Sequence, residues 1–211
     1  MSGEDGTLSP DADFIEKVLE EAGIKSCGEA KRLAIHAAEM LRWNRSIRLT
    51  AIVDPMEVAI KHIVDSLTLL KFAPFPGKLL DFGSGAGYPG IPLALYLPGT
   101  RVSLLESSVK KCAFLSHIRK MLRIENLSVV NARARIGETL PIGKFDDIVT
   151  RAAASPDIVF PLLSPYLAEG GRMLFMEGPG SEREMPGTVV RRERFTLPRG
   201  MGEREIVEVV S

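Results

Sequence analysis

The sequence predicts a doubly wound α/β fold, in which a mostly parallel sheet with helices on both faces follows an N-terminal helical extension. After Gly77, short apolar runs alternate with amphipathic segments, which is the order of strand–helix units. The residues before position 73 show helical spacing instead of this alternation. Prolines at 74 and 76 separate the two regions. We therefore expect two parts, residues 1–74 and residues 75–211.

Three helices are expected in the extension. The first, over 9–23, begins with a serine–proline pair, which is typical of an N-cap followed by a proline in the first turn. The second, over 26–42, begins with a serine and a glutamate at capping-box spacing. The third, over 54–70, begins with Asp-Pro-Met-Glu, which combines a cap, a proline and a box acid. The eight residues before them are expected to form a loose tail.

The second part is expected to hold the sheet. Strands are predicted at 78–82, 101–106, 127–131, 145–150 and 172–176, with helices at about 89–97, 107–122 and 155–168. Residues 178–187 are rich in glycine, proline and charge and are expected to form a mobile loop. Residues 188–197 and 203–210 are predicted to add a terminal antiparallel pair. Ligands of such sheets bind at the carboxyl ends of the strands, so the site residues are expected to lie there.

A glycine-rich loop follows the first predicted strand. It contains Gly83, Gly85 and Gly87, and Glu106 stands at the end of the next strand. Glycines let backbone N–H groups approach a ligand, and a carboxylate on the neighbouring strand end can hold a ribose. Asp81, at the end of the first strand, is a further candidate. The arrangement predicts a pocket for a nucleotide-type cofactor.

The identity of that cofactor follows from the charge and order of the loop. Residues 85, 87 and 90 satisfy a dinucleotide fingerprint, but that fingerprint opens directly off the strand, and here Gly83 comes first. The carboxylate of Asp81 suits an ammonium group and repels a pyrophosphate. These features favour S-adenosylmethionine (SAM) over NAD or FAD. A turn without a ligand is the remaining alternative, in which Asp81 caps the turn and Glu106 caps the following helix.

The composition limits which partners, metals and cellular locations can be expected for this chain. The chain has 211 residues and a formal net charge of zero, so any contact with nucleic acid is expected to be local. Its two cysteines, Cys27 and Cys112, form no motif and suit a reducing, cytoplasmic location. With three separate histidines they provide no metal-ligand spacing, so no metal is predicted. We also expect no membrane span and no obligate oligomer.

Several motifs together resemble one family, over about residues 30–178. They are Trp43-Asn44, Leu49-Thr50-Ala51-Ile52, His62-x-x-Asp65-Ser66-Leu67, the segment from Gly83 to Pro92, Leu104-Leu105-Glu106-Ser107 with Lys110-Lys111, and Thr150-Arg151-Ala152. This pattern is similar to that of the bacterial 16S ribosomal RNA (guanine-N7) methyltransferases, the glucose-inhibited division protein B family. The resemblance implies a Rossmann-like class I SAM-dependent methyltransferase. Its expected substrate is N7 of a guanine in small-subunit ribosomal RNA, free or in the 30S subunit.

The resemblance also implies site residues. It places SAM contacts at Gly83, Tyr88, Ala134, Arg135 and Arg151. The ring of Tyr88 lines the methionine end of SAM or packs against the sheet edge. Arg151, at a strand end, can clamp a carboxylate or phosphate, or form a surface ion pair with Asp146 or Asp157.

The catalytic candidates are Arg151, His62 and Asp65. His62, Asp65 and Ser66 share one helix face by their spacing, either as a packing seam or facing the cleft. Guanine N7 carries a lone pair and no proton, so attack on a sulfonium methyl group needs alignment and not a base.

A basic cluster provides candidates for RNA binding. Arg42, Arg45 and Arg48 surround Trp43, and Lys110 and Lys111 begin a later helix. Such groups form solvated faces, or together follow an RNA backbone.

Three positions depart from the family pattern. Arg135 stands where an acid is common, Glu177 where a lysine is frequent, and Arg48 where an asparagine is usual. These departures keep two other functions open. One, favoured by the neutral chain and Glu177, is a methyltransferase of a small molecule or protein, and the other, suggested by Arg135 and Glu177, is a non-catalytic module that binds SAM or RNA.

Overall fold

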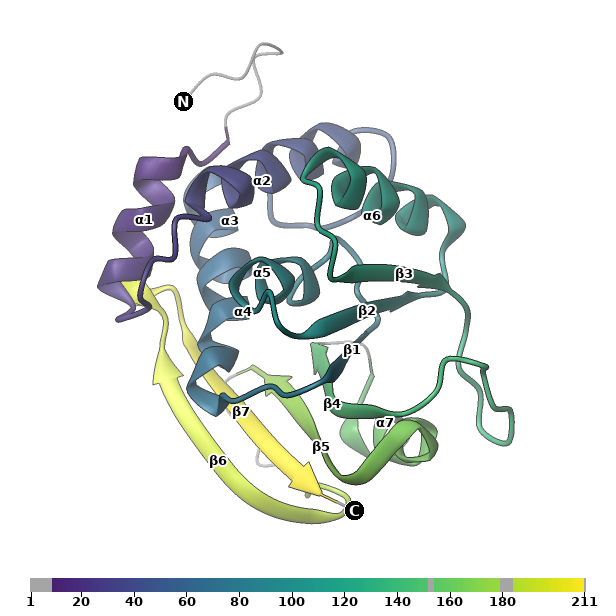
Figure 1. The fold of residues 1–211 in the computed structure, drawn as a ribbon. Coiled ribbons are helices and arrows are strands. Elements are labelled where there is room, and N and C mark those ends of the chain that lie inside the picture. Colours follow the sequence, from purple (N-terminus) through teal and green to yellow (C-terminus); the bar gives the residue numbers. More distant parts are fainter. Residues whose placement is uncertain (1–8, 152–153, 179–183, 211) are drawn as a thin grey trace.

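The computed structural model describes residues 9–151, 154–178 and 184–210. These residues form a seven-stranded sheet of order β3-β2-β1-β4-β5-β7-β6 (Figure 1). The strands are β1 (Lys78–Phe82), β2 (Arg101–Glu106), β3 (Leu127–Asn131), β4 (Phe145–Arg151), β5 (Leu167–Glu177), β6 (Thr188–Thr196) and β7 (Glu203–Val210). Strands β1 to β5 are parallel, and β7 runs antiparallel to β5 and β6. The predicted fold class and the terminal antiparallel pair are confirmed.

Only β5 differs clearly from its predicted bounds. It begins at Leu167, five residues earlier than predicted, and its register with β4 shifts between Phe145 and Asp147. The segment between Leu167 and Arg172 lies at this shift, and it contains Gly170, which has a φ of 71°. A glycine pair such as Gly170-Gly171 normally marks a turn, so the sequence pattern predicted that the strand begins after it, at residue 172.

The helices and helical turns surround this sheet. They are α1 (Ala12–Glu21), α2 (Ala30–Asn44), α3 (Pro55–Val58), the π-helix η1 (Ala59–Val64), α4 (Asp65–Leu67), the 3₁₀ turn η2 (Thr68–Phe72), α5 (Gly90–Tyr96), α6 (Val109–Met121), α7 (Pro156–Leu163), and the 3₁₀ turns η3 (Ser164–Tyr166) and η4 (Pro198–Gly200). Among the described residues, no helix is long and apolar enough to cross a membrane.

Two of the predicted helix starts are wrong. Helix α1 is capped by Asp11, whose Oδ1 accepts from the Phe14 N–H at 2.8 Å, and not by Ser9. Helix α2 begins after Glu29 without a side-chain cap, because Ser26 Oγ instead accepts from the Gly28 N–H at 3.3 Å. Local turns within a serine- and glycine-containing connection therefore replace the predicted capping box.

The third predicted helix has an unpredicted interior. Asp54 caps it as expected, with Oδ1 2.9 Å from the Glu57 nitrogen. The chain then passes through the π-helix η1 before it returns to α geometry at Asp65. Sequence spacing assumes 3.6 residues per turn, so it does not reveal this wider turn, which is frequent at functional sites. The widened turn contains His62 and ends directly before Asp65.

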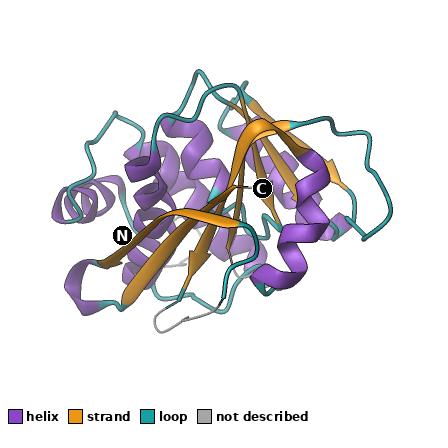
Figure 2. Cartoon of the chain, turned by 90° about the horizontal axis from the view of Figure 1, so that it is seen from below, coloured by secondary structure: helices purple, strands orange, loops and turns teal. Residues whose placement is uncertain are grey.

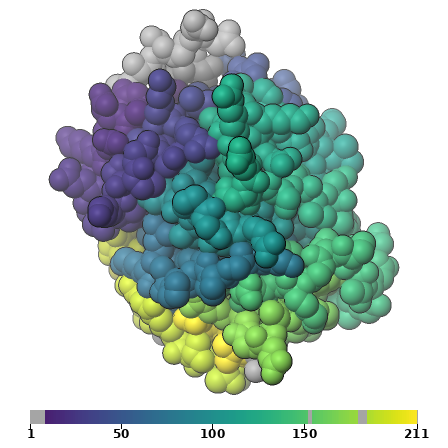
Figure 3. All heavy atoms as spheres, viewed as in Figure 1, coloured from purple at the N-terminus to yellow at the C-terminus, as the bar shows by residue number. Residues whose placement is uncertain are grey.

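Two apolar clusters fill the space on either side of the sheet. One joins α1, α2, the segment from α3 to η2, α5 and α6 to the sheet, and the other joins α7 to the opposite face. Figure 2 shows helices on both sides of the strands. In Figure 3 the atoms of the N-terminal helices lie directly against those of the later segments. Because the extension shares a core with the sheet, the division at residue 74 stays a prediction.

The C-terminal hairpin also holds the extension. Arg199, in the turn between β6 and β7, pairs with Glu21 of α1 at 2.8 Å, and its guanidinium lies 4.9 Å from the ring centre of Phe14. Arg191 of β6 donates to the Lys71 carbonyl at 2.9 Å. Figure 1 shows these strands beside α1 and the segment that leads to β1. The predicted tail and residues 179–183 of the predicted loop lie outside the described residues.

Candidate functional site

The glycine loop lies between β1 and α5 and has the backbone conformation that its glycines predict. Gly83, Gly85 and Gly87 have φ values of 75°, 55° and 88°, a region that other residues rarely enter. A Cβ at Gly87 would collide with Ile91, whereas the nearest atom to a Cβ at Gly85 is the Gly83 carbonyl oxygen at 3.7 Å. Glycine at 87 is therefore required by packing, whereas at 85 the backbone conformation favours glycine although a Cβ would have room.

Glu106 connects this loop to the next helix. Its side chain is 7% exposed, Oε2 accepts from the Gly85 N–H at 3.0 Å, and Oε1 accepts from the Ser108 N–H at 2.8 Å. Ser108 is the N-cap of α6, so this bond matches the predicted alternative in which Glu106 caps the start of the helix. Oε1 also accepts from Ser107 Oγ at 3.5 Å, so Oε2 is the oxygen that retains a second lone pair to accept from a ribose. That role stays a prediction.

Asp81 is fully enclosed beneath the start of α5. Its Oδ2 accepts from the Gly90 N–H at 3.0 Å, which is the turn-capping contact. Burial raises the pKa of this carboxyl to about 7. Among the described residues, its Oδ1 and the buried Tyr88 Oη have no hydrogen-bond partner. Both atoms are enclosed by the chain, so a direct contact of Asp81 or Tyr88 Oη with SAM stays a prediction.

Tyr88 lies within a stack of three buried rings. Its centroid is 4.5 Å from that of His36 and 4.7 Å from that of His62, with interplanar angles of 29° and 12°. His36 Nε2 lies 2.8 Å from the Ala86 carbonyl oxygen. Burial lowers the pKa of His36 to about 4 and, together with the Arg151 charge, that of His62 to about 3. Both imidazoles are neutral at pH 7, and Tyr88 is held rigidly within the loop.

Arg151, at the end of β4, brings the three catalytic candidates together. Its Nη1 donates to the Lys61 carbonyl at 3.0 Å and to Asp65 Oδ2 at 3.2 Å, and its Nη2 lies 3.2 Å from His62 Nδ1. The guanidinium is 5.8 Å from the ring centre of Tyr88. The predicted alternative, an ion pair with Asp146 or Asp157, is not the pair observed, because helix geometry around η1 presents the carboxylate of Asp65 instead.

Three residues of this network were not predicted. Thr50 Oγ1 lies 2.9 Å from His62 Nε2, and Arg204 Nε of β7 lies 3.3 Å from Asp65 Oδ1. His36 completes the ring stack. Thr50 lies in a quoted motif and His36 on the apolar face of α2, so the sequence offered weak signals for both. Arg204 reaches Asp65 only through the sheet topology, which has no local signature.

The predicted adenine-side residues lie after β3. Ala134 is half-buried, and the exposed guanidinium of Arg135 pairs with Glu138 at 3.3 Å. An exposed ion pair of this kind contributes little to stability. A cofactor contact here would use the backbone. The unusual side chain at Arg135 leaves the backbone unchanged, so it does not affect such a contact. The assignment stays a prediction.

The basic candidates lie at the end of α2, in the residues directly after it, and at the start of α6, and the two helices pack together. The Trp43 ring of α2 is 5.6 Å from that of Phe114 and 5.3 Å from that of His117, both on α6. The opposite end of α2 is tied to the end of α6, where Arg32 donates to the Leu122 carbonyl at 2.6 Å. The helices are thus antiparallel, so the end of α2 that carries the predicted arginines faces the lysine-bearing start of α6. Arg42, Arg45, Arg48 and Lys110 are exposed, and Lys111 is half-buried.

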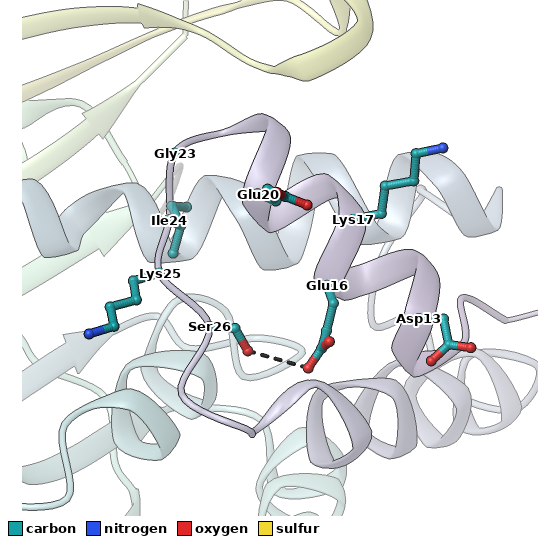
Figure 4. A pocket seen from close by; sticks show the side chains of 8 residues that line it. All are labelled: Asp13, Glu16, Lys17, Glu20, Gly23, Ile24, Lys25 and Ser26. Carbon is teal, nitrogen blue, oxygen red and sulfur yellow. Dashed lines mark hydrogen bonds between the residues drawn. The ribbon is translucent and has the colours of Figure 1, made fainter.

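Two hollows differ in what surrounds them. One, of about 380 Å³, is lined by Ile52, Lys61, His62, Asp65, Arg151, Met176, Glu177, Gly178 and Arg204. The other, of about 620 Å³, lies beside α1 and contains none of the predicted site residues; Figure 4 shows its mostly charged lining. Within the described segments, no group of three or more potential ligands could hold a metal ion.

Comparisons with known proteins identify the family of this chain. The family model of GidB, rRNA small subunit methyltransferase G, matches residues 29–193. A relative named ribosomal RNA small subunit methyltransferase G from Geobacter sp. (strain M21) is 32% identical over 209 residues, covering 94% of this chain and 96% of the relative. A protein of the same name from Anaeromyxobacter dehalogenans is 40% identical over 168 residues, covering 77% and 78%.

A solved structure supports the fold. A SAM-dependent methyltransferase from Aquifex aeolicus superposes with a TM-score of 0.56 at 14% identity, covering 74% of this chain and 94% of that one. Because the family model matches more than half of the chain and the relatives are more than 30% identical to it, the chain belongs to the rRNA small subunit methyltransferase G (GidB) family of SAM-dependent methyltransferases.

Proposed function

We propose that this chain transfers the methyl group of SAM to N7 of a guanine in small-subunit ribosomal RNA, with the RNA presented in the 30S subunit or free. The observation that carries the proposal is the junction of Arg151 with His62 and Asp65 directly beside the glycine loop. It joins the cofactor side of the sheet edge to the helical extension. A protein that modifies ribosomal RNA works where ribosomes are assembled, so a cytoplasmic location is part of this proposal.

The residues at this junction are suited to positioning. SAM supplies, when bound, a methyl group activated on a sulfonium. The guanine N7 lone pair forms the bond to that carbon while the carbon–sulfur electron pair remains on sulfur, and no proton moves. His62 faces an arginine and has its pKa lowered to about 3 by burial and by that charge, so it serves as a neutral spacer. Arg151, held by three contacts, is rigid enough to align the reactants.

The cofactor side is assigned to the loop and the strand ends. Gly83 and Gly85 would let the nucleoside lie close to the backbone and the carboxylate of Glu106 would hold it, with Ala134 and Arg135 beside the base. Asp81, Gly87 and Tyr88 shape the methionine end. These assignments are supported by the positive φ values of the loop glycines and by the position of the Glu106 carboxylate beside Gly85.

The test is transfer of labelled methyl from SAM to purified small subunits, to free small-subunit RNA and to a metabolite and protein extract. We expect label in the RNA. Label only in a protein or a small molecule would identify another methyltransferase, and SAM binding without transfer would identify a binding module.

A further inference from the structure

The hollow at the carboxyl ends of β4 and β5 has walls of two kinds. Ile52 and Met176 are apolar, whereas Arg151 and Arg204 are cationic. Its volume of about 380 Å³ is within the range of pockets that enclose small ligands. Because Arg151 also contacts the ring of Tyr88 in the glycine loop, the hollow adjoins the proposed cofactor site.

The sheet register places the two arginines on one face. Arg151 pairs with Met176, and Met176 pairs with Ile206. Side chains two residues apart on a strand face the same side, so Arg204 shares the face of Arg151 and Met176. Glu177 also lines the hollow, but its register partner is Glu205, so its side chain belongs to the opposite face.

The two arginines differ in how their donors are used. Both terminal nitrogens of Arg151 have partners within the chain. Nη1 donates to the Lys61 carbonyl and to Asp65, and Nη2 lies beside His62. Arg204 has Nε beside Asp65 and Nη1 on the Glu203 carbonyl at 2.8 Å. Across the described ranges these are its polar contacts, and they leave Nη2 for a ligand.

Charge points to a ligand that carries an acceptor. Asp65, whose side chain is 3% exposed, is shared by the two guanidinium groups. One carboxylate balances one arginine, so the face keeps an excess positive charge. Burying such a cluster costs desolvation free energy, and a compensating acceptor from a ligand would reduce that cost.

We propose that this hollow takes the guanine ring that is methylated and that Arg204 donates a hydrogen bond to guanine O6. The inference rests on the proposed function. Arginine is the usual reader of guanine O6, and the ring faces would pack on Ile52 and Met176. N7 must keep its lone pair for the methyl group, so the contact is a single bond to O6. Adenine presents an amino donor at that position, which an arginine cannot accept, so Arg204 selects guanine.

A cycle that combines a protein change with a base change tests this bond. The wild type and Arg204→Gln are each assayed on small-subunit RNA with guanine, or with 2-aminopurine, at the mapped site. 2-Aminopurine keeps N7 and lacks O6. We expect loss of O6 to lower kcat/KM of the wild type by about tenfold or more, the factor that a charge-assisted hydrogen bond contributes. In Arg204→Gln, which already lacks this bond, loss of O6 should lower kcat/KM little further.

Two further variants separate recognition from folding. Arg194→Gln removes a guanidinium that pairs with Glu205 on the same hairpin, and we expect near-wild-type kcat/KM. Arg204→Lys, which keeps a charged donor, should restore part of the activity and of the O6 dependence. Calorimetry with SAM should give equal affinities for all of them.

The outcomes distinguish the inference from the function on which it rests. A wild type that never methylates RNA would overturn the proposed function. A wild type that is active, with O6 loss and Arg204→Gln acting independently, would overturn the role of Arg204 alone. Equal impairment by Arg194→Gln would assign the effect to the hairpin and contradict the proposal in the same way.

Discussion

At the scale of single residues, the site depends on carboxylates that already have partners within the chain. Glu106 accepts from the glycine loop and from the start of α6, and Asp81 accepts from the start of α5. The sequence identified these side chains from their positions at strand ends. The structure adds that each also holds the local backbone, so a test of cofactor binding must separate the two effects.

The ribose assignment gives the first prediction. We expect Glu106→Ala to weaken SAM binding about tenfold or more, because a hydrogen bond to a charged group contributes roughly 1.5–3 kcal/mol. Calorimetry with SAM measures this. Ser108→Ala, which removes the side-chain cap of α6, is the matched control and should change the affinity little. A loss below about twofold in Glu106→Ala, or an equal loss in Ser108→Ala, would assign Glu106 to the helix start.

Buried His36 gives a prediction about pH. Burial lowers its pKa in the folded chain from 6.5 to about 4, so between these values the unfolded chain binds the additional proton. His36 therefore reduces stability as the pH falls from about 6.5 to about 4, by up to about 1.4 kcal/mol per pH unit. The raised pKa of Asp81 has the opposite effect on stability. Both the wild type and His36→Gln contain Asp81, so its contribution cancels when the two are compared.

Denaturant unfolding of the wild type and His36→Gln at several pH values measures the difference. The wild type should lose stability relative to the variant as the pH is lowered from 7 to 4.5. A difference that stays constant over this range would show that His36 does not remain neutral in the folded chain.

At the scale of elements, α2, the loop that follows it and α6 present the basic groups proposed to contact RNA. Each phosphate contact releases counterions, so log affinity should fall with log salt by about 0.7–0.9 per contact. Changing Arg42, Arg45 and Arg48 together to Ala should flatten this slope in filter binding while SAM affinity is retained. The matched control removes three exposed charges elsewhere, at Lys17, Lys25 and Lys31. An equal effect in the control would show that only net charge matters.

The elements also show where sequence patterns succeed and where they fail. The bounds of β1 to β3 are those predicted, because short apolar runs between turn residues are local signals. The π-turn that contains His62 was missed, because it interrupts an apolar pattern that α spacing already explains. The start of α2 was missed because a serine near a helix can bond within its own turn.

At the scale of the whole molecule, the sheet order assembles residues from distant segments. The family motifs predicted Arg151, His62 and Asp65 separately, and the structure joins them within hydrogen-bond distance. Arg204 has no such motif and lies beyond the matched family region, so only the pairing of β7 with β5 brings it to Asp65. Long-range pairing is what the sequence alone did not provide.

The most direct measurement is the position of the transferred methyl group in small-subunit RNA, read by chain cleavage at N7-methylated guanine. The wild type should modify guanine N7. Arg151→Ala should abolish the modification while RNA binding is largely kept, because the guanidinium no longer aligns the reactants. Methyl transfer to a protein or metabolite and never to small-subunit RNA, or full activity in Arg151→Ala, would contradict this account.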